Sequence, residues 1–281
     1  AYQATRYIDT AIPHIPVTAH GLKENGYATI ATTNWLPYSW SVNNIAFAEV
    51  MHTALSYFQA GRAEAGYKLL KSSVLDGMYL GDSPGNFGQI SFYDAARGEC
   101  YRDFGDPIGV ASRVLIQGLF GILPDALNQQ IILRPGFPDD WDKASVSTPD
   151  ISYRFTRKED TDTYHITQRF QTPLHPVLQI NARKEKIRSV KVNGVPATWQ
   201  SIESAHGYPL LSIQAEGTSS TTITIEWEGA SLHTLAVQEL VIASNGKLAL
   251  QIPSGASISQ VYDPQSVLAK HTVEALSLIH I

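Results

Sequence analysis

The hydrophobic residues in the first half of the chain recur with the spacing of an α-helix. Apolar side chains step by three and four positions over residues 47–58, and a second stripe of this kind covers residues 62–75. Such steps place the apolar side chains on one face of a helix. Gly61 separates the two stripes, and the connection is so short that the two helices are predicted to form an antiparallel hairpin.

A third helix is predicted from Asp106 to Ile122. Asp106 suits the N-cap position, Pro107 suits the first helical position, and Pro124 follows the predicted end. The preceding stretch, residues 77–105, is rich in Gly, Asp and aromatic residues. A loop of this length inside a helical domain is usually functional or forms an extended rim.

After Trp141 the hydrophobic period changes from 3.6 to 2, which predicts antiparallel strands separated by tight turns. Short strands at this spacing are typical of a β-sandwich. The predicted strands cover residues 151–155, 164–170, 177–181, 187–192, 210–214 and 221–227, with further strands at 237–243, 247–252 and 257–262.

The order of these elements divides the chain into predicted regions. Residues 1–143 form a helical region, residues 144–230 an antiparallel β-sandwich, and residues 231–276 a β-rich extension or the start of a further β module. The tail 277–281 is expected to be an artefact without structural weight. Because the chain starts at Ala1 without Met or a signal peptide, we expect a fragment whose upstream part is missing.

The composition of the chain argues against several classes of function. The chain has 281 residues, 43% of them hydrophobic, which is enough for two domains with real cores. A net charge of -5 argues against a nucleic-acid partner, which usually meets a basic face. No run of about 18 apolar residues predicts a membrane span. Cys100 is the single cysteine and is expected to be a buried structural thiol. No phosphate-loop, zinc or dinucleotide signature is present, so no cofactor or metal is expected.

Three stretches resemble the six-hairpin glycosidase superfamily. They are residues 33–44, with Trp-Leu-Pro-Tyr-Ser-Trp at their centre, residues 106–124, and residues 131–141, whose Arg-Pro-Gly-Phe-Pro-Asp-Asp-Trp is similar to the family's exit from its helical barrel. The resemblance covers residues 25–230. It implies an α+β multidomain fold, in which the C-terminal part of an (α/α)6 barrel is followed by an antiparallel β-sandwich.

The same resemblance implies a glycoside hydrolase that acts on an oligo- or polysaccharide, with inversion favoured. As a fragment, the chain is expected to be inactive by itself, and a periplasmic or secreted bacterial location is favoured. A glycoside phosphorylase is an alternative. Its phosphate would need basic hydrogen-bond donors, and the local ones are Arg97, Arg102 and Arg113. A non-catalytic glycan-binding or architectural module is another, a polysaccharide lyase is a third, and the oligomeric state stays open.

Glycoside cleavage commonly uses two carboxylates, one as acid and one as base or nucleophile. Glu99 is the first catalytic candidate, because aromatic neighbours in its loop would raise its pKa. Asp103 is the second, and Asp106 is the third, although a helix N-cap is its simplest role. An ion pair with Arg97 or Arg102 is the alternative for Glu99.

Aromatic and polar residues near these acids are candidates for sugar contacts, since sugar rings stack on aromatic faces. The predicted substrate-binding residues are Trp35, Tyr38, Trp40, Asn43, Tyr101 and Arg102. The alternative for the first aromatic group is that it seals the barrel against its loops.

Overall fold

The computed structural model of the chain resolves two compact units, Ala1–Thr234 and Leu235–Ile281. The described residues are 2–18, 22, 26–34, 44–80, 92–94, 99–101, 105–202, 209–232, 243, 245–247, 261, 263, 266–268, 272–273 and 279–280. In the second unit, β17 (Thr272–Val273) and β18 (Ile279–His280) pair antiparallel.

A hairpin of two helices forms the centre of the helical layer. Helix α2 (Phe47–Gln59) and helix α3 (Ala63–Val74) lie where the hydrophobic stripes predict them. Helix α1 (Tyr2–Ala11) joins them through a polar contact, in which Asp9 accepts from Tyr57 Oη at 2.6 Å and pairs with Arg62 Nη2 at 2.6 Å. Burial and the Asp9 carboxylate raise the pKa of Tyr57, so its hydroxyl stays a donor.

Helix α4 (Asp106–Arg113) continues without a break into the π-helical turn η2 (Val114–Leu119). A Cβ placed on Gly118 of η2 would meet the ring of Phe58, which lies near the end of α2. Helix α4 therefore runs parallel to α2, and α3 runs antiparallel to both. A second π-helical turn, η1 (Leu75–Leu80), extends α3.

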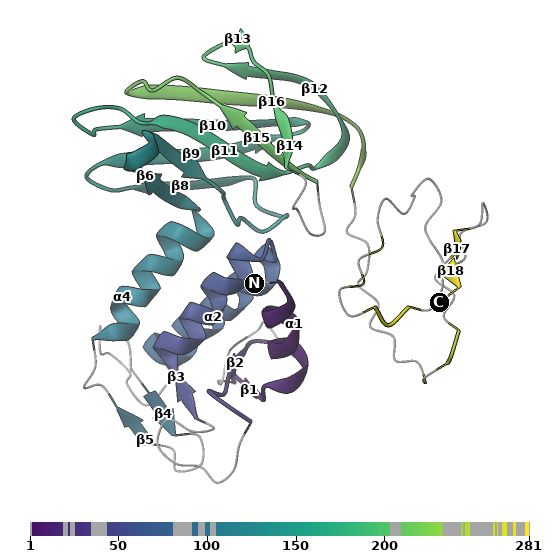
Figure 1. The fold of residues 1–281 in the computed structure, drawn as a ribbon. Coiled ribbons are helices and arrows are strands. Elements are labelled where there is room, and N and C mark those ends of the chain that lie inside the picture. Colours follow the sequence, from purple (N-terminus) through teal and green to yellow (C-terminus); the bar gives the residue numbers. More distant parts are fainter. Residues whose placement is uncertain are drawn as a thin grey trace. The chain divides into compact units, whose positions relative to one another are not determined.

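These directions give the helical layer two ends. The distal end is where α2 and α4 begin and where η1 follows α3. The proximal end is where α2 and η2 finish, beside the strands (Figure 1). At the distal end β3 (Ile45–Ala46), β4 (Phe92–Asp94) and β5 (Glu99–Tyr101) form an antiparallel sheet in that order. Strands β1 (His14–Pro16) and β2 (Ala28–Ile30) form a separate antiparallel pair.

Two larger sheets follow the helices. The first has the order β13-β12-β16-β10-β9-β8 and is antiparallel throughout; the second has the order β14-β15-β11-β7-β6, with β11 and β7 parallel. The strands are β6 (Ile122–Asp125), β7 (Gln130–Leu133), β8 (Lys143–Ser147), β9 (Ile151–Lys158), β10 (Thr161–Gln168), β11 (His175–Asn181), β12 (Lys184–Val192), β13 (Val195–Pro196), β14 (Gln200–Ile202), β15 (Leu210–Gln214) and β16 (Ser220–Ser231). The 3-10 turn η3 (Ala126–Asn128) joins β6 to β7.

The two sheets pack face to face as a sandwich around one apolar core. Alternate residues point inward, as the period of two requires. Tyr153 and Ile225 come from the six-stranded sheet, while Ile131, Leu178 and Ile213 come from the five-stranded sheet. All five side chains are buried.

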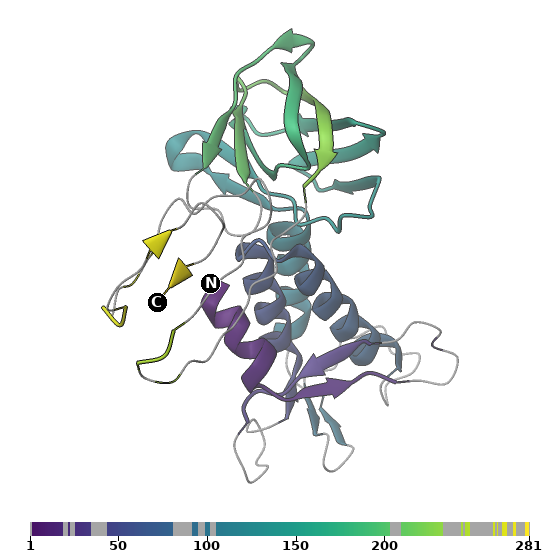
Figure 2. The same cartoon turned by 90° about the vertical axis from the view of Figure 1, so that its right-hand side faces the viewer.

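Aromatic side chains connect this core with the core of the helical layer. Phe120 and Phe137 pack against both cores. Phe137 stacks on Trp141 at 6.0 Å and on Phe155 of β9 at 5.3 Å between ring centroids, and Trp141 meets Tyr67 of α3 edge-on at 5.1 Å. The helices thus lie against the sandwich (Figure 2), and these rings form the apolar contact between the two.

The predicted fold class, with a partial (α/α)6 barrel before the sandwich, is wrong. The described part of the chain is mostly β and contains four α-helices, α1 to α4. The third predicted helix stops early, because Gly121 turns the backbone at φ +65° against the Arg134 carbonyl and Ile122 then begins β6. Ile108 and Leu115 of its predicted apolar stripe are 54% and 43% exposed, so a further helical layer does not cover this face in the described part.

The domain limits predicted at 143, 144, 230, 231 and 276 stay predictions. Strands β6 and β7 lie before residue 143 and nevertheless belong to the five-stranded sheet. Strand β7 pairs with β11 on one side and with β6 on the other.

Candidate functional site

Several predicted site residues lie outside the described part of the chain. These are Trp35, Tyr38, Trp40, Asn43, Arg102 and Asp103. The Arg97 alternative for phosphate binding lies outside it too. Their proposed roles stay predictions.

The β4–β5 hairpin fixes the backbone positions of Glu99 and Tyr101. Glu99 begins β5 and Tyr101 ends it. The antiparallel register pairs Glu99 with Asp94 and Tyr101 with Phe92. Paired acidic positions thus occupy one end of the hairpin and paired aromatic positions the other.

Asp106 stands at the same distal end, as the first residue of α4. Gly105, rather than Asp106, is the N-cap, and the helix shows no side-chain cap. The side chain of Asp106 is exposed. A carboxylate in the first turn of a helix is stabilising there because it faces the positive end of the helix dipole.

Sequence reasoning missed Asp76, the second residue of η1. Burial raises the pKa of its carboxyl to about 6. The predicted helical stripe ends at residue 75, but the chain continues through Leu80 as a π-helical turn in which Gly77 is buried. Such π-helical turns are frequent at functional sites, but no residue pattern predicts them.

Acidic residues of three separate elements thus lie toward the distal end. We call Asp76, Asp94, Glu99 and Asp106 the distal acidic set. They belong to η1, to the β4–β5 hairpin and to the start of α4. Two of them are backbone partners, and the pKa of a third is raised toward neutrality.

Within the described residues, no group of three or more His, Cys, Asp or Glu side chains could hold a metal ion. No helix in the same part of the chain has the length and apolar character needed to cross a membrane.

Comparison with known proteins gives similarity to solved structures of carbohydrate-active enzymes. No family model matches the chain. No curated protein matches it. An α-L-rhamnosidase from Dictyoglumus thermophilum is similar over 64% of this chain and 21% of its own, with 12% identity and a TM-score of 0.40.

Two further solved structures are also similar to part of this chain at low sequence identity. An α-L-rhamnosidase from Streptomyces avermitilis, complexed with L-rhamnose, covers 64% of this chain with 13% identity and a TM-score of 0.39, over 18% of its own length. A glycoside hydrolase family 30 subfamily 8 xylanase from Clostridium acetobutylicum covers 69%, with 10% identity and a TM-score of 0.21, over 42% of its own length. The chain thus spans less than half of each of these structures.

Proposed function

We propose that this protein is a glycoside hydrolase acting on an oligo- or polysaccharide. The observation that carries the proposal is the backbone pairing of Asp94 with Glu99 at the distal end of the helical layer. Partner residues in an antiparallel pair have Cα atoms about 4.5–5.5 Å apart. Hydrolysis of a glycosidic bond commonly uses two carboxyl groups that flank one bond, so a short hairpin with two neighbouring acidic positions suits this chemistry.

In the proposed mechanism Glu99 is the general acid that protonates the leaving oxygen, and Asp94 is its partner carboxylate. Two carboxylates that share a site do not ionise at the same pH, because the first negative charge disfavours the second. The carboxyl group with the higher pKa keeps its proton longer and is the one able to donate it. The partner activates the attacking water, and the inversion that the family resemblance implies requires the two carboxyl groups to stand about 6.5–9.5 Å apart.

The remaining members of the distal acidic set, with Asp103, are proposed as further acids of the same site. The pKa of Asp76, raised to about 6 by burial, suits proton transfer near neutral pH. Asp106 and Asp103 belong to the segment that follows β5 and begins α4.

The sugar contacts are proposed for aromatic and polar residues of neighbouring segments. These are Trp35, Tyr38, Trp40, Asn43, Tyr101 and Arg102. Tyr101 is a backbone partner of Phe92, so the hairpin that carries the paired acids also carries two aromatic residues.

The test compares Glu99→Gln with the unaltered sequence, in a protein that also carries the upstream residues implied by the resemblance, by release of reducing sugar from a panel of oligo- and polysaccharides. Loss of a general acid lowers the rate by about 100-fold or more. The matched control is Glu216→Gln, because Glu216 is 92% exposed on the sandwich and the substitution is chemically the same. Control activity should be unchanged.

Unchanged turnover in Glu99→Gln removes Glu99 from the acid role. Cleavage that requires inorganic phosphate identifies a phosphorylase instead. Binding of a glycan without any cleavage identifies a binding module. Proton NMR of the first product tells inversion from retention.

A further inference from the structure

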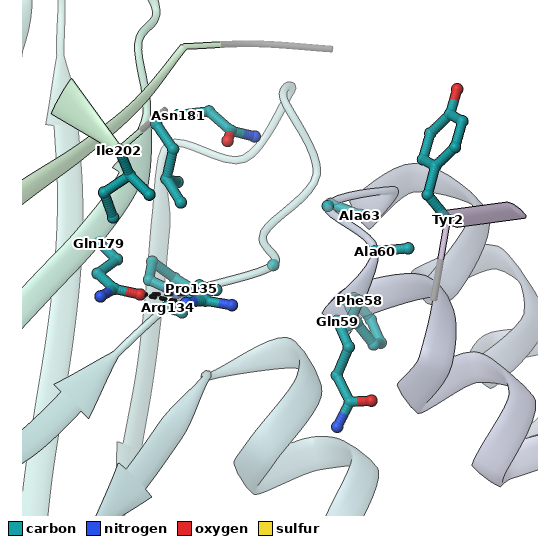
Figure 3. A pocket seen from close by; sticks show the side chains of 13 residues that line it. Tyr2, Phe58, Gln59, Ala60, Ala63, Arg134, Pro135, Gln179, Asn181 and Ile202 are labelled. Atoms are coloured by element: carbon teal, nitrogen blue, oxygen red, sulfur yellow. Dashed lines mark hydrogen bonds between the residues drawn. The ribbon is translucent and has the colours of Figure 1, made fainter. Parts of the chain in front are cut away.

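A pocket lies at the proximal end, between the α2–α3 turn and the five-stranded sheet. Its volume is about 220 Å³. Gln59 and Ala60 line it from the helical side, while Arg134, Gln179 and Asn181 line it from the sheet side (Figure 3). The pocket is smaller than the roughly 300–1,000 Å³ usual for drug-sized ligands, so it suits a molecule of about one sugar ring.

Arg134 is the charged group of this pocket, and its exposed side chain is held by Gln179. The Oε1 atom of Gln179 accepts from Arg134 Nε at 2.9 Å and also from Arg134 Nη2. In the described part of the chain no carboxylate lies within ion-pair distance of Arg134, and its Nη1 has no partner. The residues that line the pocket include no Asp or Glu. The pocket is therefore positive and has unused guanidinium donors.

Amide groups and apolar surface supply the rest of the lining. The side-chain amides of Gln59 and Asn181 make no hydrogen bond within the described residues, and each amide offers two donor hydrogens and an acceptor oxygen. Pro135, Ile202 and Leu210 add apolar surface. Guanidinium groups recognise carboxylates through paired hydrogen bonds, amides suit hydroxyl groups, and apolar surface suits the C–H face of a sugar ring.

We infer that this pocket binds an acidic monosaccharide unit, a hexuronic acid, either free or as part of a longer glycan. Arg134 binds the carboxylate, and Gln59 and Asn181 bind ring hydroxyls. The pocket adjoins the end of α2, whereas the β3–β4–β5 sheet adjoins its beginning. A helix of 13 residues is about 20 Å long, so this site is distinct from the distal acidic set.

The test is isothermal titration of the full chain with D-galacturonic acid and D-glucuronic acid. Single-site binding with a dissociation constant on the order of 1 mM is expected. The methyl ester of galacturonic acid, which keeps the ring and loses the charge, should bind at least about tenfold more weakly. Neutral galactose should behave like the ester, and acetate alone should bind more weakly than either uronic acid.

Arg134→Gln should weaken uronic-acid binding by at least about tenfold. Arg188→Gln is the matched control, because Arg188 is a 64% exposed side chain of the other sheet, and its affinity should not change. Asn181→Ala provides a second variant, with an expected loss of about three- to tenfold from one hydrogen bond. Circular dichroism compares the folding of each variant with that of the unaltered chain.

Three results would overturn the inference. They are no heat of binding from either uronic acid at about ten times the expected dissociation constant, equal affinity for the acid and its methyl ester, or full affinity in folded Arg134→Gln. Equal affinity for acetate would overturn the sugar assignment. The outcome is independent of the hydrolase proposal, because Glu99→Gln should keep uronic-acid binding and Arg134→Gln should keep the distal chemistry.

Discussion

The contact between Phe58 and Gly118 gives a sharp prediction for the junction of helices and sandwich. Phe58 is 6% exposed and lies against three glycines, Gly66, Gly118 and Gly136. A Cβ atom on Gly118 would lie 2.6 Å from Cδ2 of Phe58 and 3.2 Å from its Cγ. Ordinary carbon contacts begin near 3.5 Å, so the added methyl group overlaps the ring by almost 1 Å.

The Gly66 backbone also approaches the ring closely, since a Cβ there would lie 3.1 Å from Cδ2 and Cγ of Phe58. Overpacking of a filled core costs about 1–3 kcal/mol, and we expect Gly118→Ala to fall in the upper half of that range. Urea denaturation followed by tryptophan fluorescence measures the change in the free energy of unfolding. The double variant Phe58→Leu/Gly118→Ala should be less destabilised than the sum of the single variants, since the smaller side chain makes space.

Gly109→Ala is the control for helix propensity. Gly109 lies in α4, and a Cβ there would meet nothing within 4 Å. Alanine should therefore stabilise the helix at this position by about 0.5–1 kcal/mol. If Gly118→Ala matched this gain, or if the Phe58 and Gly118 changes were simply additive, the reasoning about close packing would be refuted.

Two further predictions concern carboxyl groups, one partly buried and one fully buried. Because the pKa of Asp76 is raised from 3.8 to about 6, its contribution to stability is present below about pH 4 and is lost as the pH rises to about 6. Asp76→Asn should remove that loss, which is worth about 3 kcal/mol for a full shift and about 1–2 kcal/mol with solvent screening. If the free energy of unfolding changed equally between pH 4 and pH 7.5 in Asp76→Asn and in the unaltered chain, this prediction would be wrong. Asp162, 2% exposed, accepts from Trp227 Nε1 at 2.9 Å and from Arg157 Nε at 3.0 Å and pairs with Arg183. Asp162→Ala should cost about 3–5 kcal/mol in the same urea assay. Asp162→Asn should cost less, because its amide oxygen still accepts from Trp227; the reverse order would show that this hydrogen bond does not stabilise the fold.

Local periodicity is why much of the secondary structure could be predicted. The stripe over residues 47–58 and the alternation over residues 151–155 each report burial on one face, and each face meets its own core. The stripe over residues 106–122 misled, because Ile108 and Leu115 remain substantially exposed and Ile122 belongs to β6. Short apolar runs fit a helix or a strand equally well until a partner strand is present.

The candidate sites depend still more on tertiary contacts. Glu99 could be chosen from its acidic and aromatic loop, but its backbone pairing with Asp94 is a matter of register between strands. Asp76 gave no sequence signal, because the burial that raises its pKa comes from other segments. The pocket of Arg134 joins residues from positions 2 to 210, which no local pattern links.

The sequence by itself determined where apolar faces occur, where glycine and proline interrupt them, and which acidic and aromatic residues occur together in one segment. These properties depend on residues that are neighbours in the chain, so they can be predicted without knowing the fold. Tertiary structure alone decided the parallel pairing of β7 with β11, the two ends of the helical layer, and the separation of the distal acidic set from the Arg134 pocket. The physical reason is that pairing, burial and charge environment depend on residues far apart in the chain, and folding is what brings them together.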